Sequence, residues 1–178
     1  YGQVWVKNTD PNELWFTDGD GADFKVSPTR FTVTTSGNGY RMGSVNTYYV
    51  GNQTLGTGVT AGDFGMYEAT YAVYNSVTTV NVHSWRWVGG FSSSVDYELE
   101  LWDVTIPSNG TAAAATAAKI GDTQSISATS TRFYTMGQTD LTHSLDAGHS
   151  LYVLIRYTSG SGSKYTYGSV FIEMADND

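Results

Sequence analysis

The sequence lacks cysteine altogether, which excludes disulfide bonds and thiolate ligands for a metal. Basic residues are also scarce, because only nine Lys and Arg are scattered along a chain whose formal net charge is -8. Binding to nucleic acid needs a basic face that neutralises phosphates, so we expect no nucleic acid partner. No apolar run in the chain approaches the roughly 18 residues of a membrane-spanning helix. The sequence therefore predicts no membrane insertion.

Aromatic residues and glycine are abundant instead. Aromatics make up 14% of the 178 residues and charged residues only 15%, and the chain contains 20 glycines. Aromatic and β-branched side chains favour strands, and Gly-rich connections favour turns, so the composition predicts an all-β protein. The length fits one medium domain with a short segment appended to it.

The first 27 residues form a distinct, turn-rich segment. Apolar residues alternate with polar ones at Val4 and Val6, recur around Leu14 and Phe16, and return at Phe24 and Val26. This pattern predicts two or three very short strands, joined by tight turns in which Gly19 or Gly21 supplies a positive φ. A sheet this small is marginal alone in water, so it must pack against the rest of the chain or against copies in neighbouring chains.

Pro28 breaks the pattern and predicts a boundary between a collar segment, residues 1–27, and a β-sandwich domain, residues 28–178. In the body, Val95, Tyr97, Leu99 and Leu101 alternate with Asp96, Glu98 and Glu100, which predicts an apolar face turned inward and a solvated acidic face. The other candidate strands follow the same criteria. Together the predicted strands cover residues 31–34, 47–50, 65–74, 77–87, 95–104, 131–136, 151–157 and 166–173.

Eight strands with Gly-rich connections predict an antiparallel, jelly-roll-like β-sandwich, with an immunoglobulin-like sandwich as the alternative. Apolar residues alternate with their neighbours at Leu151, Val153 and Ile155, and again at Val170 and Ile172. These two predicted strands would form a hairpin whose tip is the Gly-Ser stretch 159–163. Residues 111–119 are rich in alanine and look helical, but they are too few for a stable isolated helix, so we expect an exposed loop.

The polar residues give little support for catalysis. Asp18, Asp20 and Asp23 lack the closing acidic ligand of a calcium loop and favour a solvated hairpin turn. The histidines do not have zinc-site spacing, and His143 and His149 are predicted to lie on the surface. The acidic strand face around Glu98 is predicted to be solvated rather than to form a glycosidase pair. We therefore predict no catalytic residue, no metal site and no cofactor.

The best candidate for ligand recognition is the run Trp85, Arg86 and Trp87, followed by Phe91. Trp and Arg are enriched where proteins bind partners, and exposed aromatic rings stack on sugars. Alternation places Trp85 and Trp87 on one face with His83. The competing interpretation is that both Trp side chains fill the core or a seam between subunits. The same two interpretations apply to the tyrosines at 48, 49, 67, 71 and 74.

The N-terminal segment resembles a known family. Residues 2–8 (GQVWVKN), 11–18 (PNELWFTD) and 22–24 (ADF) are similar to the short β-rich segments of virion fibre and appendage proteins in tailed bacteriophages, particularly marine ones. The resemblance implies a non-enzymatic, homotrimeric structural protein with a β-rich knob, assembled in the host cytoplasm and exposed on the virion. Its implied partners are other virion proteins and a host-surface glycan or protein.

Two other functions fit the composition. A carbohydrate-binding module of a secreted bacterial protein would share the jelly roll, the acidity and the aromatic richness, but it would be monomeric. A hydrolase would need a triad or an acidic pair in a cleft, which the sequence does not contain in any known motif.

Overall fold

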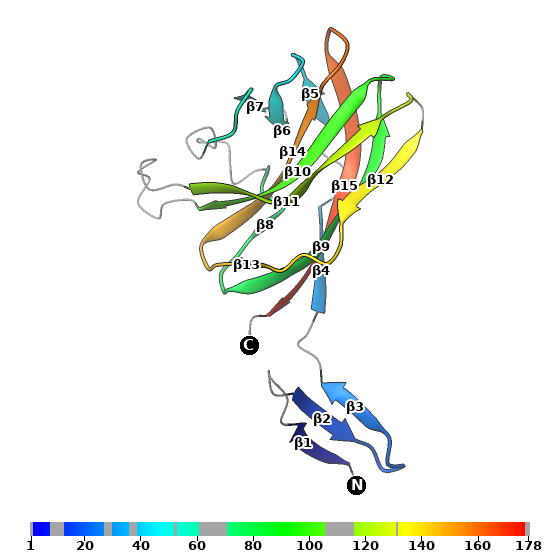
Figure 1. The fold of residues 1–178 in the computed structure, drawn as a ribbon, viewed down its shortest axis with the longest axis vertical. Helices are drawn as coiled ribbons and strands as arrows, with labels where there is room; N and C mark the ends of the chain where they lie inside the picture. Colours follow the sequence, from blue (N-terminus) through cyan, green and yellow to red (C-terminus); the bar gives the residue numbers. More distant parts are fainter. Residues whose placement is uncertain are drawn as a thin grey trace.

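The structure is a computed structural model that describes residues 2–7, 13–26, 30–35, 39–51, 53–60, 71–105, 116–130 and 132–176. Two β-assemblies make up these residues, a three-stranded sheet near the N-terminus and a two-layered sandwich (Figure 1). The all-β fold predicted from composition is confirmed. The predicted boundary at Pro28 lies outside the described residues.

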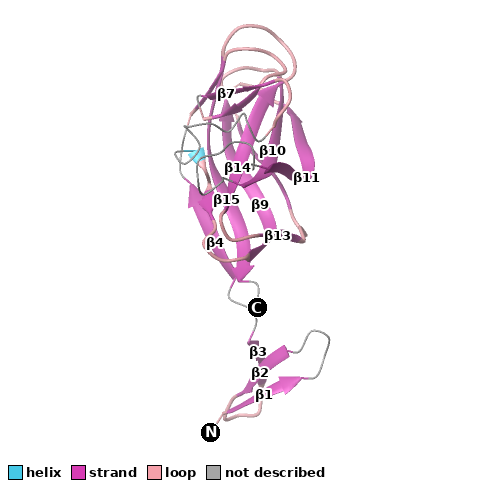
Figure 2. Cartoon of the chain, turned by 90° about the vertical axis from the view of Figure 1, so that its left-hand side faces the viewer, coloured by secondary structure: helices cyan, strands magenta, loops and turns pink. Residues whose placement is uncertain are grey.

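The N-terminal sheet consists of β1 (Gln3–Lys7), β2 (Glu13–Thr17) and β3 (Asp23–Val26), paired antiparallel in the order β1-β2-β3. Gly21 supplies the positive φ, 82°, in the turn between β2 and β3. The predicted short strands and their glycine turn are therefore confirmed. Figure 2 shows this sheet beyond one end of the sandwich, and its described strands pair only with one another.

Each layer of the sandwich is a six-stranded antiparallel sheet. The first sheet, called here the β9 sheet, contains β4 (Arg30–Thr35), β15 (Lys164–Asp176), β9 (Val80–Phe91) and β12 (Phe133–Gln138), with the short β5 (Tyr40–Met42) and β13 (His143–Leu145) beside them. The second, the β10 sheet, contains β6 (Tyr48–Val50), β14 (His149–Tyr157), β10 (Asp96–Thr105) and β11 (Thr116–Ser127), with β7 (Gln53–Gly56) and β8 (Tyr74–Asn75).

The strand order is that of a jelly roll. Its eight main strands are, in chain order, β4, β6, β9, β10, β11, β12, β14 and β15. One sheet runs β4-β15-β9-β12 and the other β6-β14-β10-β11, so the first, eighth, third and sixth main strands face the second, seventh, fourth and fifth. Two interlocked Greek keys produce this order. The prediction of a jelly roll rather than an immunoglobulin-like sandwich is confirmed.

The core between the sheets follows the predicted alternation. Tyr97, Leu99 and Leu101 are fully buried, and so is Ile172 in the facing sheet. Inward side chains from both layers meet in one continuous cluster. Burial of these side chains is the main stabilising contribution, since each contributes roughly 1.5–3 kcal/mol relative to an exposed position.

Strands β14 and β15 do not form the predicted hairpin. They lie in different sheets, with β14 between β10 and β6 and β15 between β9 and β4. The Gly-Ser stretch 159–163 is therefore a crossing between layers. Beyond the predicted inward residues, Tyr152 and Leu154 are also buried, because a second cluster with Tyr48, Val50 and Leu55 covers the outer face of β14.

The alanine-rich stretch is also a correction. We expected an exposed loop over 111–119, but Thr116 to Lys119 belong to β11, which pairs with β10 from Thr105 to Asp96. Pairing along the open edge of β10 outweighs the helical propensity of alanine. Residues 111–115 lie outside the described residues, as do residues 65–70 of the predicted strand 65–74. Of the described residues 71–74, only Tyr74 is in a strand.

Buried tyrosines predict how stability responds to alkali. Burial raises the pKa of Tyr40, Tyr48 and Tyr97 to about 12, and the neighbouring Glu100 carboxylate adds to the effect at Tyr48. In the unfolded chain a tyrosine ionises near pH ~10. The folded state therefore holds protons that the unfolded state has lost, and stability present below pH ~10 is lost as the pH rises toward ~12.

Thermal melting between pH 8 and 12 checks this prediction, with tyrosinate absorbance recorded in parallel. A Tyr48→Phe variant should lose less stability across this window than the wild type. A melting temperature that stays flat above pH 10 would contradict the assignment.

Candidate functional site

The structure separates the four residues predicted to bind a ligand. Trp85, Trp87 and Phe91 are between 1% and 4% exposed and belong to the core. The hypothesis that these three rings form a recognition surface is wrong, and the competing interpretation, core filling, holds. Only Arg86 is exposed, on the outer face of the β9 sheet. His83 does not share the inward face with Trp85, because the β9–β15 register shifts at this point and breaks the alternation.

Trp87 is accommodated by a pair of glycines. Gly89 on β9 and Gly168 on β15 lie opposite each other, and both would place a Cβ into the indole of Trp87. The ring packs over the bare backbone that these glycines leave. Gly89 and Gly168 thus make room for a core side chain.

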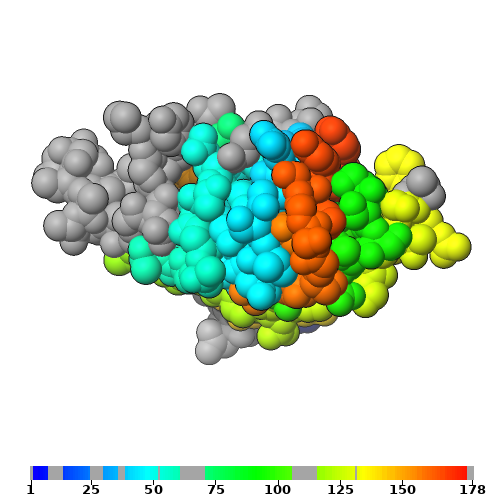
Figure 3. Space-filling view, turned by 90° about the horizontal axis from the view of Figure 1, so that it is seen from above, coloured from blue at the N-terminus to red at the C-terminus, as the bar shows by residue number. Residues whose placement is uncertain are grey.

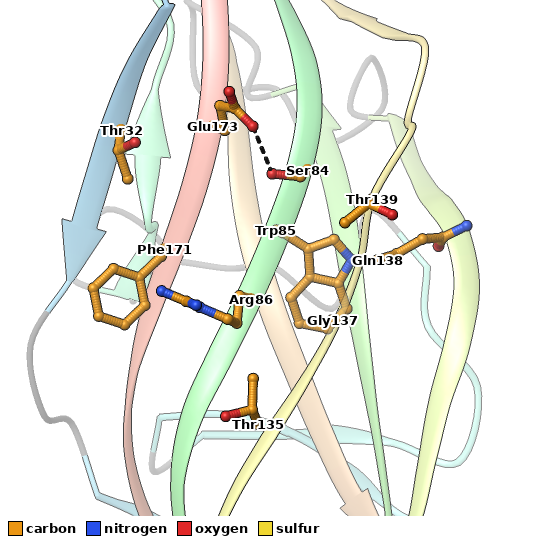
Figure 4. A pocket seen from close by; sticks show the side chains of 10 residues that line it. All are labelled: Thr32, Ser84, Trp85, Arg86, Thr135, Gly137, Gln138, Thr139, Phe171 and Glu173. Carbon is orange, nitrogen blue, oxygen red and sulfur yellow. Dashed lines mark hydrogen bonds between the residues drawn. The ribbon is translucent and has the colours of Figure 1, made fainter.

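A shallow groove lies on the outer face of the β9 sheet, around Arg86 (Figure 4). Its volume is about 470 Å³. The Arg86 guanidinium carbon lies 5.1 Å from the ring centre of Phe171, a cation–π contact. Glu173 accepts hydrogen bonds from Ser84 (3.1 Å) and Arg30 (3.0 Å), and these bonds lower the pKa of its carboxyl. The remaining lining is mostly polar: Thr32, Thr135, Gly137, Gln138 and Thr139, with Trp85.

The N-terminal sheet exposes an apolar face, which we call the collar face. It is made by Val4, Val6, Leu14, Phe16 and Phe24, whose exposure ranges from 38% to 68%. The register places Val4, Phe16 and Phe24 in one row across the three strands and pairs Val6 with Leu14 in the next. A contiguous apolar patch of this kind marks an interaction surface in a soluble protein.

The opposite face of the same sheet is closed by its own contacts. Trp5 and Trp15 stack with ring centres 5.7 Å apart, and Lys7 lies over the Trp15 ring. The Trp5 indole N–H donates to Thr17, whose hydroxyl donates to Asp23. The two faces of the collar sheet therefore differ, since one is apolar and exposed and the other is closed by ring stacking and hydrogen bonds.

Asp18 shapes the turn that ends β2. Its carboxylate accepts the backbone N–H groups of Asp20 (3.0 Å) and Ala22 (2.9 Å), and its own N–H donates to the Ala22 carbonyl. The predicted hairpin turn is confirmed. Among the described residues, no three His, Asp or Glu side chains are grouped as metal ligands. In the same part of the chain no helix is long and apolar enough to cross a membrane.

His143 and His149 are not simple surface residues. Both are half-buried, and the carboxylate of Asp103 bridges them, with 2.8 Å to Nε2 of His143 and 2.8 Å to Nδ1 of His149. Because β13 and β14 lie in different sheets, Asp103 links the two layers at their edge.

A hydroxyl completes this group. Thr105 Oγ1 lies 3.1 Å from Nε2 and 3.5 Å from Nδ1 of His149, so it sits beside the ring edge between the two nitrogens. The Thr116 hydroxyl, 2.7 Å away, holds Thr105 in this position.

Glu100 departs from the predicted solvated acidic face. It is 3% exposed, and its carboxylate accepts hydrogen bonds from Tyr48 (3.1 Å), Trp102 (2.8 Å) and Thr123 (2.6 Å). The β10–β11 register shifts between Leu99 and Leu101, at the position of Glu100. Both oxygens are occupied by donors, so Glu100 has a structural role rather than that of a glycosidase acid.

Comparison with known proteins gives distant structural similarity alone. No protein-family model matches the sequence, and no curated protein matches it. A chain from the structure of infectious bursal disease virus, Gt strain, is 14% identical to this chain with a TM-score of 0.40. The match covers 91% of this chain and 42% of the viral chain. The VP2 subviral particle of the same virus is 16% identical with a TM-score of 0.38, over 85% and 34%.

A carbohydrate-binding structure is similar to a comparable degree. The CBM22-1 xylan-binding domain of Paenibacillus barcinonensis Xyn10C is 11% identical with a TM-score of 0.35, over 99% of this chain and 83% of that chain. This chain spans less than half of the viral chains that it matches. The likeness concerns the β-sandwich architecture alone.

Proposed function

We propose that the chain is a non-enzymatic structural component of a tailed-phage virion, a homotrimeric fibre or appendage protein. In this proposal the N-terminal sheet is the collar that holds the copies together, and the jelly roll is the knob exposed on the particle. The collar face is the observation that supports it.

The collar face needs a cover. Burying a Val, Leu or Phe side chain contributes roughly 1.5–3 kcal/mol relative to leaving it in water, and five such side chains lie together. Three strands of four or five residues cannot fold over their own face. No described strand of the sandwich pairs with the collar sheet. We therefore infer that another molecule covers it.

Copies of the same chain are the occupant that fits best. The collar face carries no charged side chain among its five residues, so an equally apolar surface complements it, and a symmetric assembly supplies that surface from identical sheets. Three copies, rather than two or six, follow from the resemblance of residues 2–24 to phage fibre segments. The same resemblance supports the virion as the location and other virion proteins as neighbours.

The alternative is a carbohydrate-binding module. The exposed side chains of Phe133 and Tyr167 on the sandwich favour it, since rings in water are typical of sugar-binding surfaces. A module of this kind would act as a monomer, so the oligomeric state separates the two functions.

A charge substitution on the collar face tests the proposal. In Val6→Asp/Phe16→Asp, like carboxylates from each copy would meet in an apolar interface, so we expect the assembly to dissociate to monomers. The melting temperature of the knob should change little. Size-exclusion chromatography with light scattering measures the mass.

The matched control is Val77→Asp/Phe133→Asp, which places two carboxylates at sandwich positions that are each 85% exposed. This variant should remain assembled. Persistence of the oligomer in the collar variant, or its loss in the control alone, would rule out the collar face as the interface.

A further inference from the structure

Two aromatic side chains stand in water on the outer face of the β9 sheet. Phe133 on β12 is 85% exposed and Tyr167 on β15 is 62% exposed. Both are in register with Gly90 on β9, so the two rings flank a glycine in the strand between them. Figure 3 shows the segment around β12, in yellow, projecting beyond β9, in green. Large rings held out in this way cost free energy unless a ligand covers them.

Gly90 forms the floor between the rings. A cavity of about 240 Å³ lies there, lined by Gly90, Phe91, Ser92, Arg132, Phe133 and Tyr167. A Cβ at Gly90 would lie 3.3 Å from the carbonyl oxygen of Arg132, so any side chain would occupy the space that the glycine leaves open. The ring of Tyr167 rests against Gly39, which fixes its position at one side of the cavity.

The cavity and the Arg86 groove lie along the same strand face. Gly90 and Arg86 are four residues apart on β9 and point to the same side, which separates them by about 14 Å at ~3.4 Å per residue. Thr32 on β4 and Thr135 on β12 line the groove with hydroxyl groups, whereas the amide of Gln138 is hydrogen-bonded to Asp122. The face therefore offers rings at one end and hydrogen-bonding groups at the other, over the length of a short oligomer.

Uncompensated positive charge distinguishes this face. Within the described residues, no carboxylate forms an ion pair with Arg86 or Arg132, and Glu173, the carboxylate that lines the groove, is paired with Arg30. This occurs in a chain of net charge -8. A guanidinium binds carboxylate or sulfate by parallel hydrogen bonds, so the two arginines select an anionic group.

We propose that this face binds an acidic oligosaccharide. The rings of Phe133 and Tyr167 stack on the apolar faces of one sugar unit above Gly90, and the polar side chains of the groove bind the hydroxyls of further units. Arg132 and Arg86 bind the acidic substituents.

This inference does not depend on the collar. The face belongs to one sandwich, so the collar variant Val6→Asp/Phe16→Asp should bind each oligosaccharide as the wild type does. Loss of assembly and loss of binding are therefore separate outcomes.

Titration calorimetry on the full chain tests the proposal with three probes: polygalacturonate fragments, which carry carboxylates, dextran sulfate fragments, and neutral maltodextrin fragments. We expect binding of at least one anionic probe. Phe133→Ala and Arg86→Gln should each weaken it by about tenfold or more, which corresponds to ~1.4 kcal/mol. Val77→Ala, which removes an equally exposed side chain away from this face, should leave affinity unchanged.

The source of the anion is read from the probes, since preference for polygalacturonate indicates a uronic acid and preference for dextran sulfate indicates a sulfated sugar. Absence of binding to both anionic probes would overturn the proposal. Equal binding of maltodextrin, with no effect of Arg86→Gln, would overturn it as well. Binding that survives Phe133→Ala and Arg86→Gln unchanged would show that the ligand sits elsewhere.

Discussion

Leu99→Asp is expected to abolish the folded sandwich. Leu99 is fully buried on β10, with β11 on one side and β14 on the other, in the cluster that joins the two sheets. An unpaired carboxylate in such a place costs several kcal/mol, and a domain has only about 5–15 kcal/mol of stability in total. Circular dichroism and thermal melting should show an unfolded or aggregated chain.

The control for this substitution is Val77→Asp. Val77 is 85% exposed, so the same change in chemistry should alter stability by no more than about 0.5 kcal/mol. A soluble Leu99→Asp protein with the wild-type melting temperature would mean that the inward face of β10 is wrongly assigned.

Gly89→Ala is expected to have the second large effect, although it adds only one methyl group. The new Cβ would overlap the carbonyl oxygen of Tyr167 and the indole of Trp87, and neither the backbone of β15 nor a ring that is 1% exposed can move freely. Overpacking of this kind costs about 1–3 kcal/mol, occasionally more. For a chain of this size the melting temperature should fall by roughly 2–4 °C per kcal/mol.

Gly58→Ala is the matched control. An added Cβ at Gly58 meets nothing within 4 Å, and Gly58 is not among the glycines of positive φ. This variant should melt with the wild type or slightly above it, because alanine reduces the entropy of the unfolded chain. Equal melting temperatures for the two alanine variants would contradict the packing of Trp87 over the glycine pair.

The sequence was most informative where alternation is strong. Leu99 and Leu101 could be assigned to the core because the acidic residues that alternate with them indicate which face of the strand points outward. The pairing of β14 could not be read in the same way. Its run from Leu151 to Ile155 is apolar at nearly every position, which is typical of a strand buried on both faces, and only the second cluster around Tyr48 explains this.

Which aromatic side chains point outward was harder to predict, because Trp85 and Phe133 each lie in a strand where no clear alternation of polar and apolar residues marks the outer face. The β9–β15 register shift near His83 adds a residue that no local pattern reveals. In β12, Tyr134 and Met136 turn inward and leave Phe133 outward. The sequence left Trp85 and Trp87 with two interpretations, a recognition surface or the core. The glycines that decide for the core at Trp87, Gly89 and Gly168, lie 79 residues apart in the chain.

The collar was the part that the sequence described best, since short strands, a glycine turn and an apolar row can all be read locally. What covers that row depends on other molecules, and the mass of the intact chain in solution tests it most directly. Light scattering at micromolar concentration should give the mass of three 19.3 kDa chains. A stable monomer would contradict the collar and favour the carbohydrate-binding module, and an assembly of two or six copies would contradict the three-fold symmetry.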